Sequence, residues 1–69
     1  MSRSRCIIVD LAVSANECLV WLAANAPRIV VESAVDLAGA ALIAIIVQAP
    51  DDLQMVKRRF PRAIETSHH

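Results

Sequence analysis

The sequence is short of the residues on which most enzymes depend. Its only histidines, His68 and His69, are the last two of 69 residues, where chain ends fray. They are either native or a purification remnant, and no nucleophile in the body of the chain has an imidazole near it in the sequence. Gly39 is the only glycine, so there is no glycine-rich phosphate loop. We therefore expect no enzymatic activity and no cofactor.

Cysteine is scarce as well. Cys6 and Cys18 fit no zinc or redox spacing, and two thiols make a poor disulfide framework. Small heavy-metal-associated domains carry C-x-x-C after their first strand, where this chain has Val13-Ser14-Ala15-Asn16. Both cysteines have apolar neighbours, so we expect them to be buried as small hydrophobic side chains and expect no metal site.

An excess of charge of either sign is also absent. Seven basic and seven acidic side chains cancel, which argues against bulk nucleic acid or an anionic membrane surface as partner. The basic cluster Lys57-Arg58-Arg59 has only one aromatic residue near it, Phe60, so it offers no stacking platform for single strands. We interpret the cluster as a solvated helix end, with a phosphate site as the alternative.

Long apolar runs are missing, although 57% of the residues are hydrophobic. The strongest stretch, residues 37–47, is shorter than the roughly 20 residues that a bilayer requires. Asp10 interrupts the first apolar run too early for a signal peptide. The hydrophobic share excludes disorder, and one glycine with three prolines excludes a loop-rich protein. We expect one soluble, cytoplasmic domain over residues 1–69.

Residues 5–13 alternate in the way that predicts a β-strand. One face of this strand carries Ile7, Val9, Leu11 and Val13. The other face carries Cys6, Ile8, Asp10 and Ala12. We expect Ile8 and Asp10 to point outward, away from the helices.

A helix is predicted over residues 15–25. Ser14-Ala15-Asn16-Glu17 has the form of a capping box, and Pro27 ends the run. The apolar stripe of this helix comprises Leu19, Leu22, Ala23 and Ala26. Trp21 lies off the stripe, so it is either an interface anchor or part of the periphery of the core.

The segment 28–48 decides the fold. Ile29-Val30-Val31 and residues 43–47 favour strands, whereas i, i+3, i+4 spacing of apolar residues also fits one helix. We favour two strands, 28–35 and 41–48, with a turn over Asp36 to Gly39. Glycine in mid-segment and the density of β-branched residues both lower the helix propensity.

A second helix begins near Pro50, with Asp51 and Asp52 complementing its positive end, and stops at Pro61. Residues 62–67 then predict a short edge strand. The order strand, helix, strand, strand, helix, strand is the ferredoxin-like, or split βαβ, arrangement, so we predict an α+β two-layer sandwich. Two helices would cover one face of the sheet.

The sequence resembles two groups of proteins, one for each interpretation of residues 28–48. The first two thirds of the chain, with residues 28–48 taken as a helix, resemble the ribbon-helix-helix repressors, which implies a mainly α dimer and a DNA-binding regulator. The favoured strand order, the turn near Asp36 and the strand after Pro61 resemble ferredoxin-like regulatory and chaperone modules, including the assembly chaperone of periplasmic nitrate reductase. In those modules the sheet or its edge binds a peptide, a small molecule or another copy of itself.

The apolar excess indicates a protein-binding surface. One two-layer core cannot bury 57% hydrophobic residues in so short a chain, and we expect a homodimer or a complex with a larger protein. On the open sheet face we expect Ile8, Val30, Ala34 and either Leu42 with Ile46 or Ile43 with Ile45. Asp10, Glu32 and Asp36 would rim this face and select a basic or helical partner, or would merely be solubilising charges. The predicted protein-binding residues are Ile8, Asp10, Trp21, Val30, Glu32 and Asp36.

Overall fold

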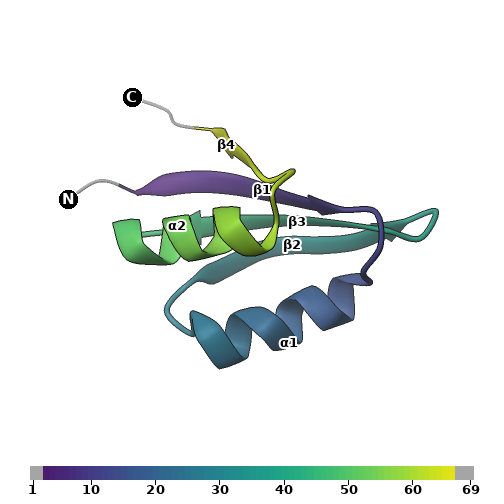
Figure 1. The fold of residues 1–69 in the computed structure, drawn as a ribbon, viewed down its shortest axis with the longest axis horizontal. Coiled ribbons are helices and arrows are strands. Elements are labelled where there is room, and N and C mark those ends of the chain that lie inside the picture. The colour runs from purple at the N-terminus through teal and green to yellow at the C-terminus, as the bar shows by residue number, and fades with distance from the viewer. Residues whose placement is uncertain (1–2, 67–69) are drawn as a thin grey trace.

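The computed structural model describes residues 3–66 and has an α+β architecture (Figure 1). Its elements are β1 (Ser4–Asp10), α1 (Ala15–Asn25), β2 (Val30–Leu37), β3 (Ala40–Val47), α2 (Pro50–Arg59) and β4 (Ile64–Thr66). Segment 28–48 therefore forms two strands, and the helix that the ribbon-helix-helix alternative requires there is not formed. His68 and His69, whose origin the sequence leaves open, lie outside the described residues.

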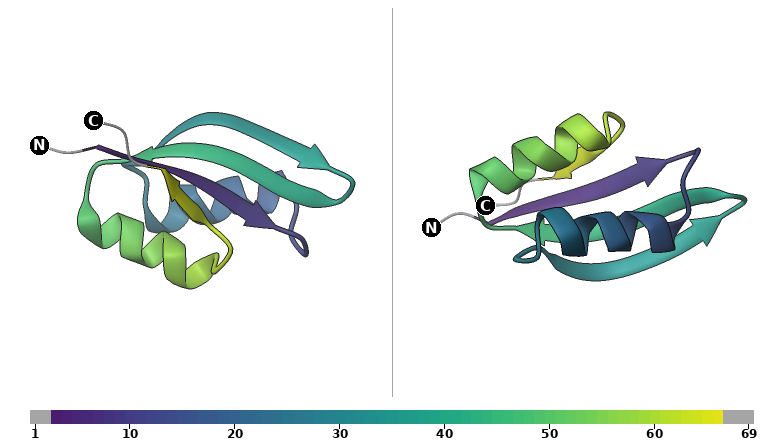
Figure 2. Two further views of the ribbon diagram at one scale, coloured as in Figure 1. Left: turned by 90° about the horizontal axis from the view of Figure 1, so that it is seen from above. Right: turned by 60° about the horizontal axis from the view of Figure 1, so that its bottom comes forward.

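The four strands form one sheet in the order β2-β3-β1-β4, and every neighbouring pair is antiparallel. Both helices lie against the same face of this sheet, so the molecule has two layers (Figure 2). We call the side beneath the helices the covered face and the other side the open face. No element among residues 3–66 lies over the open face.

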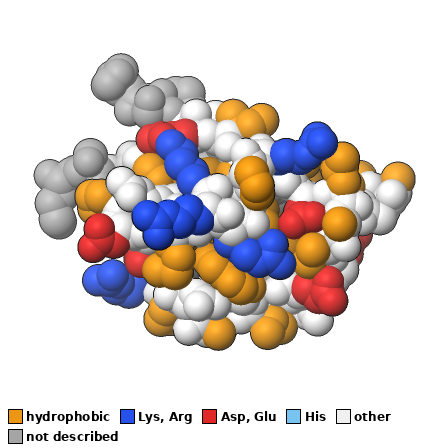
Figure 3. Space-filling model, in the orientation of Figure 1, with side chains coloured by type: hydrophobic (Ala, Val, Ile, Leu, Met, Phe, Trp, Pro, Cys, Tyr) orange, Lys and Arg blue, Asp and Glu red, His pale blue; other side chains and the backbone are white. Residues whose placement is uncertain are grey.

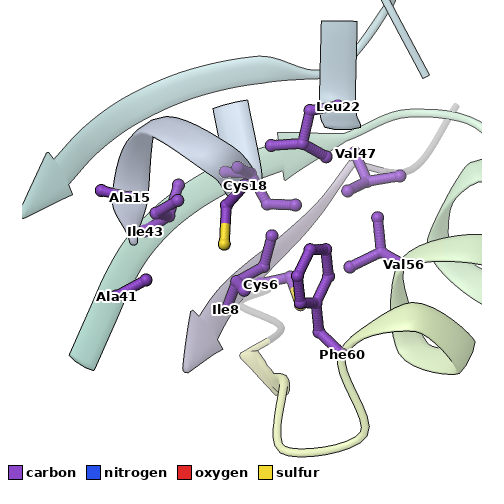
Figure 4. Packing of buried hydrophobic residues seen from close by; sticks show 11 residues of the cluster. Cys6, Ile8, Ala15, Cys18, Leu22, Ala41, Ile43, Val47, Val56 and Phe60 are labelled. Atoms are coloured by element: carbon purple, nitrogen blue, oxygen red, sulfur yellow. The ribbon is translucent and has the colours of Figure 1, made fainter. Parts of the chain in front are cut away.

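The core lies between the covered face and the helices (Figure 4). Its strand side chains come from alternate positions of β1 and β3, which are Cys6, Ile8, Ala41, Ile43, Ile45 and Val47. From the helix layer the main core side chains are Cys18, Leu22, Val56 and Phe60, the last being the C-cap residue of α2. Both cysteines are free and buried, which confirms their prediction as small hydrophobic core residues.

The outward placement predicted for Ile8 is wrong. Ile8 has no exposed surface and lies opposite Ile43, which is also fully buried beneath the helices. Both faces of β1 are apolar, so alternation separates two sets of residues without saying which set the helices cover. That choice depends on the hand of the strand–helix–strand crossover, which is a property of the tertiary fold.

The first strand is shorter than the predicted 5–13. It ends at Asp10, whose Oδ1 accepts a hydrogen bond from the Ala12 N–H at 2.8 Å. An aspartate side chain that accepts from the backbone two residues on forms a local turn, which competes with strand continuation. The chain then enters α1 through Ser14.

Helix α1 begins and ends as predicted. The Ser14 hydroxyl accepts from the Glu17 N–H at 3.2 Å, and a Glu17 carboxylate oxygen accepts from the Ser14 N–H at 3.4 Å. The buried stripe is rotated from the predicted one, because Ala15, Cys18 and Leu22 face the sheet. Ala23, which the prediction had included in the stripe, is exposed.

The β2–β3 connection is tighter than the predicted turn over residues 36–39. Only Ala38 and Gly39 lie between the strands, at φ 51° and φ 85°. Two consecutive positive φ values are the signature of a type I′ hairpin turn, whose twist matches that of the strands. Strand β2 consequently ends at Leu37, two residues closer to the turn than its predicted end at residue 35.

Helix α2 and β4 follow the predicted order. Pro50 opens the helix, two aspartates lie in its first turn, and Lys57, Arg58 and Arg59 lie in its last. Lys57 Nζ donates to Glu65 Oε1 at 2.7 Å, and this bond raises the pKa of Lys57. Arg59 lies over the Phe60 ring, 4.8 Å from its centroid. Figure 3 shows the basic side chains on this side of the molecule as separate patches with hydrophobic side chains between them.

Candidate functional site

The open face of the sheet is an apolar surface that no element of residues 3–66 covers. Strand pairing places its side chains in three rows that run across the sheet. Row 1 consists of Thr66, Arg5, Ile46 and Val30. Row 2 consists of Ile64, Ile7, Ala44 and Ser33. Row 3 consists of Val9, Leu42 and Val35, because β4 is too short to reach it.

Large hydrophobic side chains remain exposed on this face. Val30 is 50% exposed, Val35 44%, Leu37 55% and Ile64 55%. These are four of the seven large hydrophobic residues that are exposed among residues 3–66. In the middle of the face, Leu42, Ala44 and Ile46 are half-buried. A continuous apolar face of this kind is typical of an interaction surface.

One end of the open face is charged. Arg5 Nη2 lies 3.5 Å from Glu32 Oε2, so the pair spans β3 from β1 to β2. Arg3 and Arg5 also line a hollow of about 360 Å³ with Ile46 and Thr66. The opposite end, toward the β2–β3 turn, carries apolar side chains such as Leu37. The open face is therefore polar at the end where β1 and β2 begin and apolar at the end where they finish.

A β-bulge in β2 separates two carboxylates that regular alternation would place together. The pairing of β2 with β3 shifts between Val31 and Ser33, so Glu32 is an extra residue in the ladder. Glu32 consequently points to the open face, whereas Asp36 points to the covered face. Asp36 Oδ1 accepts from the Ala15 N–H at 2.8 Å. The predicted position of Asp36 on the rim of the open face is wrong, because it instead satisfies a free donor at the start of α1.

Asp10 is also on the covered side, and its predicted position on the open face is wrong. Its register partner Ala41 is fully buried, and Asp10 Oδ2 lies 3.9 Å from Arg59 Nη1. Asp10 lies two residues after Ile8 on β1 and therefore shares its face, so both residues lie on the covered side instead of the predicted open face. The three-carboxylate rim is thus reduced to Glu32 alone.

Trp21 is half-buried in the helix layer, and its ring meets that of Phe60 edge to face with 5.3 Å between centroids. It therefore belongs to the periphery of the core. It also lines a shallow hollow of about 500 Å³ with Val20, Glu17 and Arg59, so a role in binding stays a prediction.

Of the five residues predicted for the open face, Ile8, Asp10, Val30, Glu32 and Asp36, only Val30 and Glu32 lie there. Sequence reasoning missed Ile7, Val9, Ala44, Val35, Leu37 and Ile64. One signal could have found the correct face of β1. Arg5 shares its face with Ile7 and Val9, and an arginine is far more often exposed than buried.

The described residues show few groups that could carry chemistry. Among residues 3–66, no three His, Cys, Asp or Glu side chains lie close enough to hold a metal ion together. Burial raises the pKa of both the Cys6 and the Cys18 thiols, so neither is an activated nucleophile. No helix within the described part of the chain has the length and apolar character needed to cross a bilayer.

Comparisons with protein-family models, with curated proteins and with solved structures found no match to this chain.

Proposed function

We propose that this protein is a non-enzymatic protein-binding module that acts as a homodimer through its open sheet face. We further propose that its architecture is the ferredoxin-like one. The order of elements and the strand order β2-β3-β1-β4 support that assignment. The observation that carries the functional proposal is the run of apolar side chains in rows 1 to 3, which no element of the described chain covers.

The size of the face fits a second copy of the chain. Four strands spaced about 4.8 Å apart make it about 19 Å wide, and three rows with their side chains extend about 20 Å along the strands. Two such footprints have a flat area of about 760 Å², and because side chains roughen both faces the total accessible surface buried is about 1,000 Å², which is the small end for specific interfaces. We therefore expect a reversible dimer with a dissociation constant in the micromolar range.

The charge on the face favours self-association over a strongly charged partner. Arg5 and Glu32 already neutralise each other within one copy, and the chain has no net charge. A face of this kind repels neither itself nor a neutral protein surface. Arg3, which lies at the same end, adds one cation, too few to select nucleic acid, whose binding depends on several uncompensated cations.

Replacing Ala44 by lysine tests the proposal. Ala44 lies in the middle of row 2, so a lysine there would extend into water in a monomer but would be forced into the centre of a dimer. Sedimentation equilibrium should give twice the 7.5 kDa chain mass for the wild type and the chain mass for Ala44→Lys. The matched control is Val20→Lys, on the outer side of α1, which should remain dimeric.

The homodimer proposal is overturned if the wild-type chain is still monomeric at a concentration 100-fold above a micromolar dissociation constant. An Ala44→Lys protein that folds, as judged by circular dichroism, and remains dimeric would exclude the open face. In that case the hollow beside Trp21 becomes the next surface to test. If Ala44→Lys does not fold, Val35→Lys at the edge of row 3 provides the same measurement.

A further inference from the structure

The open face differs between its two ends, and this polarity restricts how two copies can pack on it. Row 1 holds Arg5 and lies beside Glu32, whereas row 3 and the neighbouring Leu37 are entirely apolar. Two identical sheets packed face to face are related by a two-fold axis that lies between them. That axis runs either along the strands or across them.

We propose that two copies of this chain pack open face to open face with the two-fold axis parallel to the strands. The inference rests on the proposed function and specifies its geometry. In this arrangement β4 of one copy lies over β2 of the second, and β1 lies over β3. Each row faces its own counterpart, so row 1 meets row 1.

Side-chain size supports this arrangement in row 2. Ile64 at one edge of the sheet comes to lie over Ser33 of the second copy, and Ile7 comes to lie over Ala44. Both contacts put a branched side chain over a small one, and symmetry repeats each contact. Alternation of large and small side chains lets two layers interdigitate without voids.

Charge supports it in row 1. When row 1 meets row 1, each Glu32 comes near Arg5 of the second copy as well as its own. An axis across the strands would instead place the charged end of each copy over the apolar end of the other. Arg5 and Glu32 would then lose water without gaining partners, which is unfavourable.

The free edge of β2 is the other route to a second copy. Its outer backbone groups are unpaired within the described chain, but the bulge at Glu32 interrupts the regular ladder that edge-to-edge pairing needs. Edge pairing would also leave the apolar rows uncovered. The open face therefore accounts for more of the exposed hydrophobic surface than the edge does.

Cross-linking between two variants, each carrying one added cysteine, tests the direction of the two-fold axis. Ile64→Cys and Ser33→Cys lie at opposite edges of one sheet, about 14 Å apart, yet face each other across the proposed dimer. The native Cys6 and Cys18 are buried, at 1% and 0% exposure, so the added thiols react first. The reagent is a bis-maleimide whose spacer matches the separation of about 10 Å between packed sheets.

An equimolar mixture of the two variants should give a covalent dimer of one Ile64→Cys and one Ser33→Cys chain, while neither variant alone should cross-link. Cross-linking of each variant with itself would indicate an axis across the strands and overturn the inference. A dimer by sedimentation with no cross-link in any sample would overturn it as well. A monomer by sedimentation would instead show that the proposed function itself has failed.

Reversing one charge gives a second readout. Glu32→Arg would gather only cations at the charged end of the dimer, so its dissociation constant at low ionic strength should rise about tenfold. Adding Arg5→Glu restores opposite charges and should recover most of the affinity. With an axis across the strands the two charged ends are far apart, and an unchanged dissociation constant for Glu32→Arg would overturn the inference.

Discussion

The two faces of the sheet are built from the same residue types but differ in how deeply their side chains are buried. On β3, Ile43 and Ile45 point under the helices and have no exposed surface, while Leu42 and Ile46 point the other way and are half-buried. On β1, Cys6 and Ile8 are buried, and Ile7 and Val9 lie on the open face. Apolar composition is thus nearly equal on the two sides.

The difference lies in what covers each face. The covered face receives two helices, with Leu22 from α1 and with Val56 and the C-cap residue Phe60 from α2, and residues 3–66 form no third layer on the other side. A sheet that is apolar on both faces normally has both faces buried. We infer that the missing layer is supplied by another molecule, and the following experiments separate a core residue from an interface residue.

The largest expected effect comes from two adjacent isoleucines. Ile45→Ala removes a fully buried side chain and should lower the free energy of unfolding by about 2–5 kcal/mol. Ile46→Ala, its neighbour on the open face, should cost less than about 1.5 kcal/mol in the monomer while weakening the dimer. Urea unfolding followed by circular dichroism at low concentration measures the first quantity. Equal losses for both variants would mean that the two faces do not differ.

The two carboxylates of β2 provide the next comparison. Asp36→Ala removes the acceptor for the Ala15 N–H and should lower the free energy of unfolding by about 1–2 kcal/mol, as loss of a helix cap does. Glu32→Ala breaks only an exposed 3.5 Å ion pair and should cost less than about 1 kcal/mol. Thermal unfolding of the monomer compares them. If Glu32→Ala proved the more destabilising, the bulge would be wrongly placed.

The smallest effect concerns the hairpin tip, which touches neither face. Ala38 has φ 51°, a conformation that costs an alanine about 1–2 kcal/mol and that asparagine tolerates better. Ala38→Asn should therefore raise the free energy of unfolding by roughly 0.5–1 kcal/mol without changing dimerisation. Gly39→Ala is the control, because no atom lies within 4 Å of the added methyl group and only the strain at φ 85° opposes it. A neutral Gly39→Ala would contradict the type I′ turn.

Several features could be predicted from local sequence because local forces produce them. The capping box at Ser14 and the stop at Pro61 define helix ends through hydrogen bonds and steric clashes between near neighbours. The density of β-branched residues and the lone Gly39 correctly favoured a hairpin over a helix in segment 28–48. Burial of both cysteines followed from their apolar neighbours.

Most of the candidate site could not be predicted in this way. Assigning Ile8 and Asp10 to the open face required knowing on which side of the sheet the helices pack, and alternation is silent on that point. Assigning Asp36 required the bulge at Glu32, which shifts every later residue of β2 to the other face. The error for Asp36 could not be corrected from the pattern of β2 alone, whereas Arg5 in β1 did indicate the correct face for Ile8 and Asp10.

The sequence by itself determined the α+β class, the order of helices and strands and the surplus of apolar side chains, since propensities, caps and composition act through short-range contacts. Only the tertiary structure decided which side chains became core and which became the open face. That decision depends on the hand of the crossovers, on the register between strands and on one extra residue in β2. These are long-range properties, and in a sheet with two apolar faces the alternation of apolar residues along a single strand does not choose between them.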